Sequence, residues 1–441
     1  MRLEGAIKKV YLVVFFLYFA SLQLWNNILS KDYSKIQYII FGVYVIFIFT
    51  YFLKSIFSKN RYSTILYVLI LIMILYYIFV ITNGIEFGNP ARMAIGINQY
   101  ILYSVSFFVP IVILYKELNL KSIEKIFAIL LIINFITSVL AAYEYSTGKY
   151  IINQNQDIGE IYITGVNMVR AKVFNGSYLS LGGFIGQLAI LNLYFLLSNK
   201  YKRLKIVFVI SFFVDILGIV STNSRGPFVA TGIAISVFFI IYYIYIMGRK
   251  QTIYKKICVI ILAFFVLILI LLGLSYLTSY TGNVNNQVLN YLIYRAKSIF
   301  DWNSDGSNLL RKYYWISFIN LFRRNFLYGI GISSTGALVD TVSIGPTESG
   351  VLKRFVELGI FGAAIYYLFV CIVFVSVFRC LNKLKDNYEK KIVIITLFSA
   401  VFCLFINDIT YQIFENFQVM FFNWFIYGML VVMLFKKEKL D

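Results

Sequence analysis

The chain has 441 residues, of which 60% are hydrophobic and only 14% are charged, and its mean hydropathy is +0.80. A soluble domain carries roughly a quarter charged residues, because they cover its surface. The chain has no histidine, which excludes mechanisms that need a histidine base, metal ligand or proton switch. Its four cysteines lie in or beside apolar segments, so neither a disulfide framework nor a zinc cluster is indicated. This composition predicts a polytopic integral membrane protein.

Apolar windows of about 20 residues predict an all-α fold of about twelve transmembrane helices. In chain order they are expected near 10–29, 36–53, 64–82, 97–115, 123–144, 178–198, 204–221, 227–247, 256–274, 351–378, 392–411 and 417–435. The first is too long for a secretory signal and lacks a small-residue cleavage site, so it is predicted to be an anchored span. We expect residues 1–441 to form a single polytopic membrane domain.

The distribution of basic residues predicts the orientation. They crowd the N-terminus and every second connection after it, so that 25 of the 40 Lys and Arg residues lie on one side. By the positive-inside rule, that side and both termini are predicted to be cytoplasmic. The net charge of +20 is then mostly a consequence of topology, and it does not indicate a nucleic-acid partner.

Two connections on the opposite side are long, about 145–177 and about 275–350. The second lies between the ninth and tenth predicted spans, and we expect it to be a large extracytoplasmic loop that contains short helices. Four of its residues share one face of a predicted helix at steps of 4, 3 and 4: Arg311, Trp315, Phe318 and Phe322. Such a helix is expected at the membrane interface, with its apolar face toward lipid or the helix bundle.

Cations on the outer side carry functional information, because the positive-inside rule does not account for them. The candidates are Arg170, Lys172, Arg225, Arg295, Arg311, Lys353 and Arg354. A guanidinium group grips phosphate oxygens through paired hydrogen bonds. Several arginines that converge at the outer leaflet could bind a lipid-linked diphosphate and stabilise it as it leaves, with no metal required.

The alternative for each cation is that it extends to the interface, pairs with an acid or contacts lipid headgroups. Arg225 is the strongest candidate for a functional role, since it lies in a very short turn between Ser224 and Gly226-Pro227. A side chain in such a turn has little freedom to reach into water.

Glu348 is the candidate base, because it precedes the tenth span directly after Pro346-Thr347. In the first turn of a helix the dipole favours the carboxylate form. Beside Lys353 and Arg354, this carboxylate could accept a proton from a sugar hydroxyl. The alternative is that Glu348 only stabilises the start of the helix.

The other acids rank lower. Glu357 is spaced to pair with Lys353 or Arg354 and is interpreted as structural. Asp215 lies inside the seventh predicted span, where it is either a proton relay or a buried hydrogen-bond anchor. Asp408 and Glu415 follow the eleventh span and remain minor candidates.

Four motifs occur in order between about 165 and 365. An arginine precedes a middle span in a Gly- and Phe-rich stretch (170–183), and a short outer turn reads T-x-S-R-G (222–226). The large loop carries R-x-x-x-W (311–315) and then G-x-G (329–331), and the next span carries E-x-G-x-x-G (357–362). In this order and spacing the chain resembles the bacterial O-antigen ligase and polysaccharide repeat-unit polymerase superfamily.

The resemblance implies a helical glycosyltransferase of the bacterial plasma membrane. It would act on undecaprenyl-diphosphate-linked oligosaccharides at the outer leaflet, without a metal, cofactor or nucleotide sugar. In the ligase branch a histidine that serves as base typically opens the span after the large loop. This chain has PTESG there and no histidine, which favours the polymerase branch found in capsule and O-antigen assembly.

On this interpretation Arg170, Arg225 and Arg311 hold the diphosphate, and Glu348 orients or deprotonates the acceptor. Residues expected to bind the substrate around them are Lys172, Arg295, Trp315, Lys353 and Arg354. The expected partners are the lipid-linked oligosaccharide and the bilayer, with a chain-length regulator and a flippase as further candidates.

Two other functions stay open. A ligase would use the same donor chemistry with a different acceptor, and the lack of histidine counts against it. A flippase for the lipid-linked oligosaccharide should carry ionisable residues deep in several spans, whereas essentially only Asp215 lies so deep here.

Overall fold

The computed structural model describes residues 63–87, 90–115, 117–151, 169–175, 177–247, 306–335, 347–384 and 387–436. Within these ranges all regular elements are helical, and the α-helices are α4 (Thr64–Phe87), α5 (Pro90–Tyr100), α6 (Leu120–Thr147), α8 (Tyr178–Ala189), α9 (Leu191–Leu197), α10 (Lys205–Ser221), α11 (Arg225–Tyr245), α14 (Gly306–Arg324), α15 (Gly350–Lys383), α16 (Tyr388–Thr410) and α17 (Phe417–Phe435). Shorter segments are η1 (Leu102–Phe107), η2 (Val109–Ile113), η3 (Asn199–Leu204) and η5 (Ile413–Glu415).

Nine helical stretches in the described part of the chain are long and apolar enough to cross a membrane. They overlap one to one with nine of the predicted spans, while 10–29, 36–53 and 256–274 lie outside the described residues. The all-helical membrane fold is therefore confirmed. The total of twelve spans, the single domain and the extent of the 275–350 loop stay predictions.

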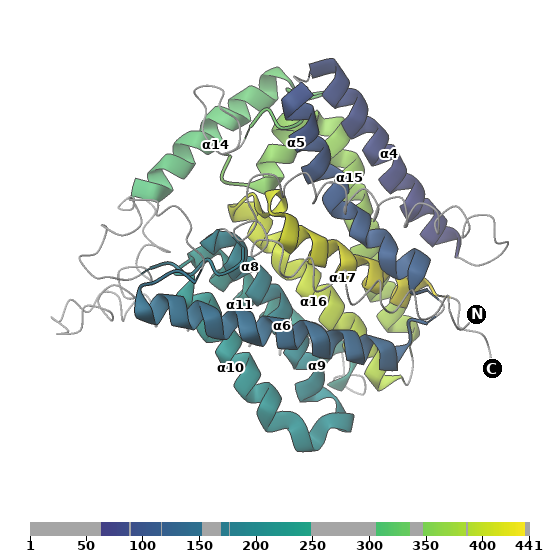
Figure 1. Ribbon diagram of the computed structural model, residues 1–441. Helices are drawn as coiled ribbons and strands as arrows, with labels where there is room; N and C mark the ends of the chain where they lie inside the picture. The colour runs from purple at the N-terminus through teal and green to yellow at the C-terminus, as the bar shows by residue number, and fades with distance from the viewer. Residues whose placement is uncertain are drawn as a thin grey trace, which may run out of the picture.

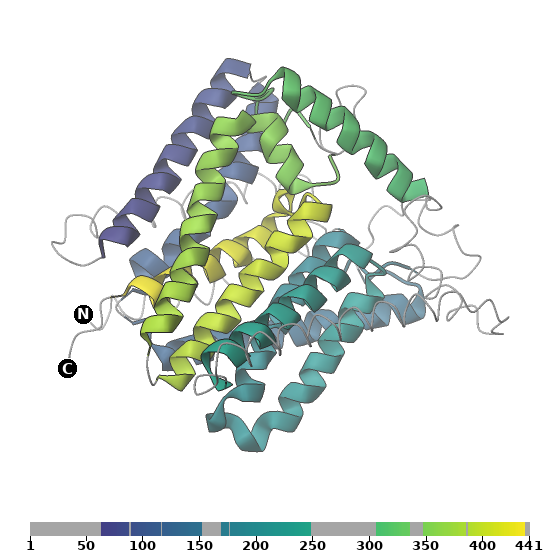
Figure 2. The same ribbon diagram turned by 180° about the vertical axis from the view of Figure 1, so that it is seen from behind.

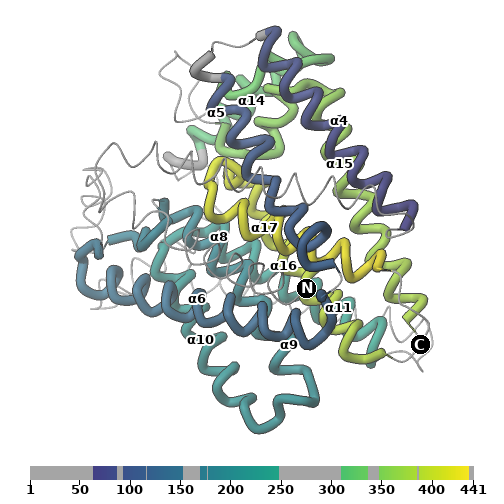
Figure 3. Tube along the Cα trace, turned by 45° about the vertical axis from the view of Figure 1, so that its right-hand side comes forward, coloured from purple at the N-terminus to yellow at the C-terminus, as the bar shows by residue number. Residues whose placement is uncertain are grey.

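The helices form a bundle in which α16 and α17 are central. Helix α11 packs against α16 and α8, α10 packs against α6 and α8, and α15 packs against α4 (Figures 1 and 3). The outer helices keep large apolar side chains on their surface, such as Ile206 and Phe213, which are 70% and 63% exposed. A surface of this kind suits lipid, because hydrocarbon tails solvate apolar side chains and water does not.

The connections gather at the two ends of the bundle as the charge pattern predicts. At one end, Lys391 Nζ donates to the Tyr245 carbonyl (3.1 Å) and Lys436 Nζ donates to the Leu118 carbonyl (2.9 Å). At the other end, the segment before α8 meets the α16–α17 connection, where Asn416 Nδ2 donates to the Asn175 carbonyl (3.1 Å). These described connections thus lie at the ends that the alternation predicts, while the side of the membrane that each end faces stays a prediction.

Helix α15 is broken at Gly359, whose φ of 63° lies in the left-handed region (Figure 2). Before the break, the carbonyls of 356–357 accept N–H groups of 330–331, at N···O distances of 3.0 and 3.1 Å. After it, the N–H groups of 360–361 donate to the carbonyls of 326–327, at 2.8 and 3.4 Å. The break frees backbone groups that hydrocarbon cannot solvate, and the segment after α14 pairs with them.

This arrangement explains why G-x-G and E-x-G occur together in the sequence. A Cβ atom on Gly329 would collide with the Glu357 carbonyl, and one on Gly359 would collide with the Leu327 carbonyl. Both glycines also have positive φ. Only glycine allows the two backbones to come this close.

We predict that Gly359→Ala lowers the free energy of unfolding by about 2 kcal/mol or more, since it combines a backbone collision with a left-handed φ. Thermal unfolding of the protein in detergent measures the loss. The matched control is Gly232→Ala on α11, where an added Cβ meets nothing within 4 Å. Equal melting temperatures for the two variants would contradict the interlocking of 326–331 with the break.

Candidate active site

Three segments that carry predicted site residues meet around the α16–α17 connection. The Ala171 N–H, next to Arg170, donates to the Ser221 carbonyl (3.1 Å), four residues before Arg225. The Gly350 N–H, two residues after Glu348, donates to the Tyr411 carbonyl (3.3 Å). The structure therefore gathers the segments of Arg170, Arg225 and Glu348 at one end of the bundle.

Arg311 and Glu348 form an ion pair, with Arg311 Nε donating to Glu348 Oε2 at 3.1 Å. Both side chains remain about one quarter exposed, at 25% and 26%. Two residues that lie 37 positions apart in sequence, one predicted to bind the diphosphate and one to act as base, are thus in direct contact.

Helix α14 carries Arg311 on the face that the sequence predicts. Phe318 on the same face is fully buried, Trp315 is half-buried, and the Phe322 ring lies 5.5 Å from the Phe355 ring of α15. The amphipathic face is directed at the bundle, which excludes the alternative that it faces lipid along its whole length. Packing of Phe318 and Phe322 holds Arg311 toward Glu348.

Arg170 and Lys172 lie in an irregular segment before α8. The Arg170 guanidinium lies over the Tyr178 ring at 4.4 Å, and the Lys172 ammonium lies 5.5 Å from the Tyr150 ring. Arg170 is half-buried, whereas Lys172 is only 5% exposed. Such rings favour a nearby cation without neutralising it.

Glu144, at the end of α6, fixes this segment. Its Oε2 accepts the backbone N–H groups of Lys172 (2.9 Å) and Val173 (3.0 Å), and its Oε1 accepts the N–H of Ile151 (3.0 Å). Hydrogen bonds to a charged acceptor are the strong ones. They hold Val173 at a φ of 43°, which a β-branched residue adopts only when its surroundings impose it.

Arg225 is the first residue of α11 and is half-buried. The next residue, Gly226, lies against the end of α16, since an added Cβ would come within 3.0 Å of Thr410 Oγ1. The start of α11 therefore adjoins the α16–α17 connection. Its N-terminal N–H groups and the Arg225 side chain create a positive region at this end of the bundle.

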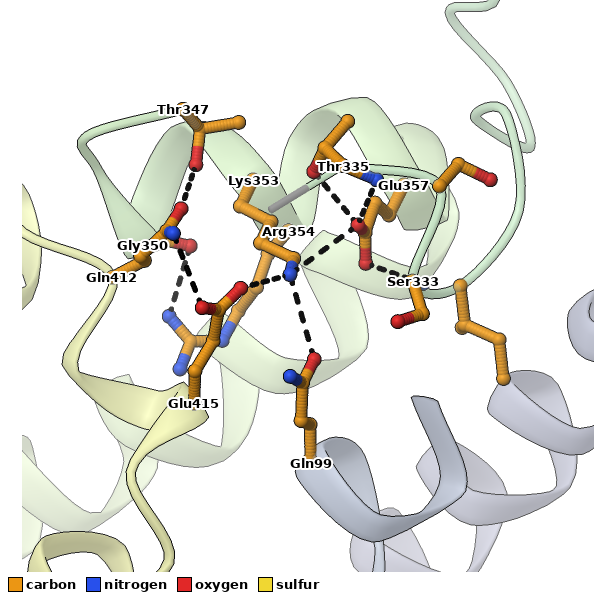
Figure 4. A network of polar contacts seen from close by, with 12 residues as sticks. Gln99, Ser333, Thr335, Thr347, Gly350, Lys353, Arg354, Glu357, Gln412 and Glu415 are labelled. Carbon is orange, nitrogen blue, oxygen red and sulfur yellow. Dashed lines mark hydrogen bonds and ion pairs between the residues drawn. The ribbon is translucent and has the colours of Figure 1, made fainter. Parts of the chain in front are cut away.

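Lys353 and Arg354 have a different environment, because both are buried, at 0% and 3% exposure. Figure 4 shows the Lys353 ammonium between the carboxylates of Glu415 and Glu357, with Nζ–Oε1 at 3.5 Å for Glu357, and near Gln99 Oε1 at 3.4 Å. Arg354 Nη1 pairs with Asp408 and donates to the Gly350 carbonyl (3.2 Å). Their contacts are with protein carboxylates, and their predicted substrate binding stays a prediction.

Glu357 has the structural role that its spacing predicts. Its carboxylate accepts the N–H groups of Ser333 and Thr335 (both 2.9 Å), the Thr335 hydroxyl (2.7 Å) and the Tyr100 hydroxyl (2.7 Å). Together with its ion pair to Lys353, it joins the segment after G-x-G to α5 and α15.

Glu415 lies in the connection between α16 and α17. Burial raises the pKa of its carboxyl group, and the adjoining Lys353 ammonium opposes that rise. Removal of Lys353 would therefore leave the Glu415 carboxylate buried without its counter-charge, whereas Lys353 would keep Glu357 if Glu415 were removed.

Backbone strain is concentrated in the same segments. Among the described residues, the non-glycine positions with positive φ are Val173, Asn223, Ser333 and Glu348. Each costs of order 1–3 kcal/mol and persists only where the surrounding structure imposes it. Three of them belong to the segments of Lys172, Arg225 and Glu348. The fourth, Ser333, donates its backbone N–H to the Glu357 carboxylate. Strained positions of this kind cluster at functional sites.

The sequence did not single out Glu144. It made Asp408 and Glu415 only minor candidates, although they pair with Arg354 and Lys353. Glu144 was visible only as an acid at the end of an apolar span. Nothing in the sequence of the long outer connection 145–177 indicated that its backbone would donate hydrogen bonds to that carboxylate. Arg295 lies outside the described residues.

Asp215 is fully buried, and its carboxylate accepts hydrogen bonds from Ser138 Oγ (3.0 Å) and Asn192 Nδ2 (2.8 Å). Of the two interpretations of Asp215, a proton relay and a buried hydrogen-bond anchor, these contacts agree with the anchor. In the described part of the chain, no group of three or more His, Cys, Asp and Glu residues could hold a metal ion.

The sequence model of the O-antigen ligase family matches residues 206–367. The matched region contains Arg225, Arg311, Glu348 and the break in α15, and it ends before α16. No curated protein matches the chain. The family match confirms the resemblance to the O-antigen ligase and polymerase superfamily, and with the apolar helices it supports a multi-pass membrane enzyme of the glycosyltransferase type.

We predict that Glu144→Gln loosens the 169–175 segment. The Glu144 carboxylate accepts three backbone N–H groups with two oxygens, whereas a glutamine amide has only one acceptor oxygen. The local cost should be about 1–3 kcal/mol. Hydrogen exchange of the Lys172 and Val173 amides measures it. The control is Glu117→Gln, since the Glu117 side chain is exposed. Unchanged protection of both amides would refute the positioning role of Glu144.

Proposed function

We propose that the protein is a polysaccharide repeat-unit polymerase of the bacterial plasma membrane. It lengthens an undecaprenyl-diphosphate-linked glycan of the capsular or O-antigen type at the outer leaflet. The family match supports the broader class of O-antigen ligase and polymerase-type enzymes. The choice of the polymerase rests on the chain itself, which has Glu348 and no histidine at the start of α15.

The observation that carries the proposal is the partly exposed contact between Arg311 and Glu348, at 3.1 Å. A carboxylate beside a guanidinium at the end of the bundle offers a base next to a phosphate-binding group. The pair is not locked in the interior, unlike Lys353 and Arg354. Glu348 adopts a left-handed φ of 51°, which is unfavourable for a non-glycine residue. Such strain is typical of functional sites, and it supports a functional role for the position of this carboxylate.

In the proposed reaction, a hydroxyl oxygen of the acceptor sugar attacks the anomeric carbon of the donor. The bond between that carbon and the diphosphate oxygen breaks, and undecaprenyl diphosphate leaves with the electron pair. Glu348 takes the hydroxyl proton. Arg170, Arg225 and Arg311 stabilise the negative charge that develops on the leaving diphosphate. The acceptor also supplies part of the binding energy through contacts of its sugar rings with aromatic residues such as Trp315.

Lys353 and Arg354 are assigned to positioning in this proposal. Their ion pairs with Asp408 and Glu415 hold the first turns of α15 against the end of α16 and the α16–α17 connection. Glu348 directly precedes those turns. A cation whose charge is satisfied by buried carboxylates has little attraction left for a diphosphate.

Glycan analysis in a strain that lacks the gene separates the three candidate functions. A polymerase leaves lipid-linked single repeats at the outer leaflet that never lengthen. A ligase leaves full-length chains on the lipid carrier, and a flippase leaves single repeats at the inner leaflet. Either of the last two results would refute the proposed polymerase.

We predict that Arg225→Ala and Arg311→Ala, introduced into that strain, each reduce chain extension by about 100-fold or more, because one donor to a developing anion is lost. Gel profiles of the surface glycan report the extension, and immunoblots check protein level. The control is Arg324→Ala, which removes an exposed cation from the same helix as Arg311. Normal chain length in either test variant would exclude that arginine from the reaction.

We also predict that Glu348→Gln lowers the turnover number by about 100-fold or more while donor affinity changes little, since the amide keeps the shape and loses the base. Single-turnover kinetics with purified lipid-linked repeats separate these quantities. Glu86→Gln is the control, because Glu86 is exposed near the end of α4. A loss confined to donor affinity would show that Glu348 orients Arg311 and does not accept the proton.

A further inference from the structure

Asn407 is a buried amide without an assigned role. It lies in the last turns of α16 and is 0% exposed, and within the described residues neither polar atom of its side chain has a hydrogen-bond partner. Each buried polar group that lacks a hydrogen-bond partner lowers the stability of the fold by about 1–3 kcal/mol. Such a group requires an explanation, which is usually a water molecule or a ligand.

Two glycines pack closely against this amide. An added Cβ on Gly183 of α8 would come within 2.6 Å of Asn407 Nδ2, and one on Gly226 of α11 would come within 3.4 Å of Asn407 Oδ1. The amide therefore lies between α8 and the first turn of α11. A polar atom of a ligand that reaches this first turn comes within reach of Asn407.

Ser224 gives a second, independent observation at the same place. It is the residue before α11 and is 8% exposed, but its side chain does not cap the helix. Among the described residues its hydroxyl also has no partner. Serine at this position normally accepts an N–H of the first turn. Here the hydroxyl is left to donate to something else.

The donors around this turn select an anion. The first turn of an α-helix presents N–H groups without intrahelical acceptors, and its dipole favours negative charge. Gly226 leaves that backbone uncovered by a side chain, and Arg225 adds a guanidinium group. Two carboxylates at this end of the bundle, Asp408 and Glu415, are paired with Arg354 and Lys353, so their repulsion of an anion is reduced.

We infer that Ser224, Gly226 and Asn407 complete a binding site for the diphosphate of the lipid-linked donor at the first turn of α11. This inference rests on the proposed function, because it takes its ligand from that reaction. The Ser224 hydroxyl donates to a diphosphate oxygen that Arg225 also contacts. The Asn407 amide has no hydrogen bond to break, so a half-turn of the amide group brings its Nδ2, which lies against Gly183, to the side of Gly226, where it donates to the same diphosphate. Asn407 is thereby a specificity residue on a helix that follows the region matched by the family.

The test is binding of undecaprenyl diphosphate to the purified full-length protein in nanodiscs of neutral lipid. The variants are Ser224→Ala, which removes one donor, and Asn407→Asp, which keeps the shape and repels an anion. Loss of a hydrogen bond to a charged group should raise Kd by about 10-fold or more. The matched control is Ser399→Ala, since Ser399 is a buried serine on α16 whose hydroxyl likewise has no partner within the described residues.

Weaker binding by both test variants, with the control unchanged, supports the site. Wild-type affinity in both variants overturns it, and if Asn407→Asp does not fold, the Ser224→Ala result alone decides. Equal competition by inorganic diphosphate would assign the site to a free anion, and equal competition by phosphatidylglycerol would assign it to a general headgroup. Either of these outcomes overturns a site for the lipid-linked donor.

A separate measurement distinguishes failure of the proposed function. Wild-type protein in the same nanodiscs is given lipid-linked repeats, and their extension is followed. If undecaprenyl diphosphate binds as inferred and no repeat is extended, the polymerase is refuted while the diphosphate site stands. If repeats are extended and the variants bind normally, only the role of Ser224 and Asn407 is refuted.

Discussion

Burial of two adjacent cations, Lys353 and Arg354, is the constraint on which this end of the bundle depends. An unpaired charge in a low-dielectric interior costs several kcal/mol, so each needs a carboxylate where it lies. Those carboxylates come from α15 itself, from the last turn of α16 and from the α16–α17 connection. Pairing therefore dictates that the start of α15, the end of α16 and the segment after it meet. The segments with the candidate site residues are attached to this meeting point.

The break in α15 extends the same arrangement to α14. Glu357 uses its side chain to bind 333–335 and its carbonyl to bind Gly331, so one residue fixes the segment after G-x-G twice. That segment follows directly from α14, whose Phe318 and Phe322 pack toward the bundle. The position of Arg311 beside Glu348 is then a consequence of the break, and a continuous α15 would leave nothing to receive the backbone of 326–331.

Much of the fold follows from local pattern, while the site depends on contacts between distant segments. The spans, the face of α14 and the i,i+4 pairing of Glu357 with Lys353 could be predicted because each is written within one helix. Arg354 pairs with Asp408, 54 positions away, and Glu144 binds backbone about 28 positions away. No periodicity encodes such pairs. Sequence reasoning therefore grouped Lys353 and Arg354 with the phosphate-binding cations, although the structure surrounds them with protein carboxylates.

The cations at this end fall into two classes with different capacities. The buried cluster contains Lys353 and Arg354 against Glu357, Asp408 and Glu415, a formal balance of two positive and three negative charges. The formal charge of this cluster is not positive, so we expect it to contribute little attraction for a diphosphate. In the proposed reaction, the attraction for the diphosphate is assigned to Arg170 over the ring of Tyr178, Arg225 at the N-terminus of α11 and the partly exposed Arg311. The buried cluster positions the segments, and the proposal leaves phosphate binding to cations outside it, such as Arg170 over a neutral ring and Arg311 in a partly exposed ion pair.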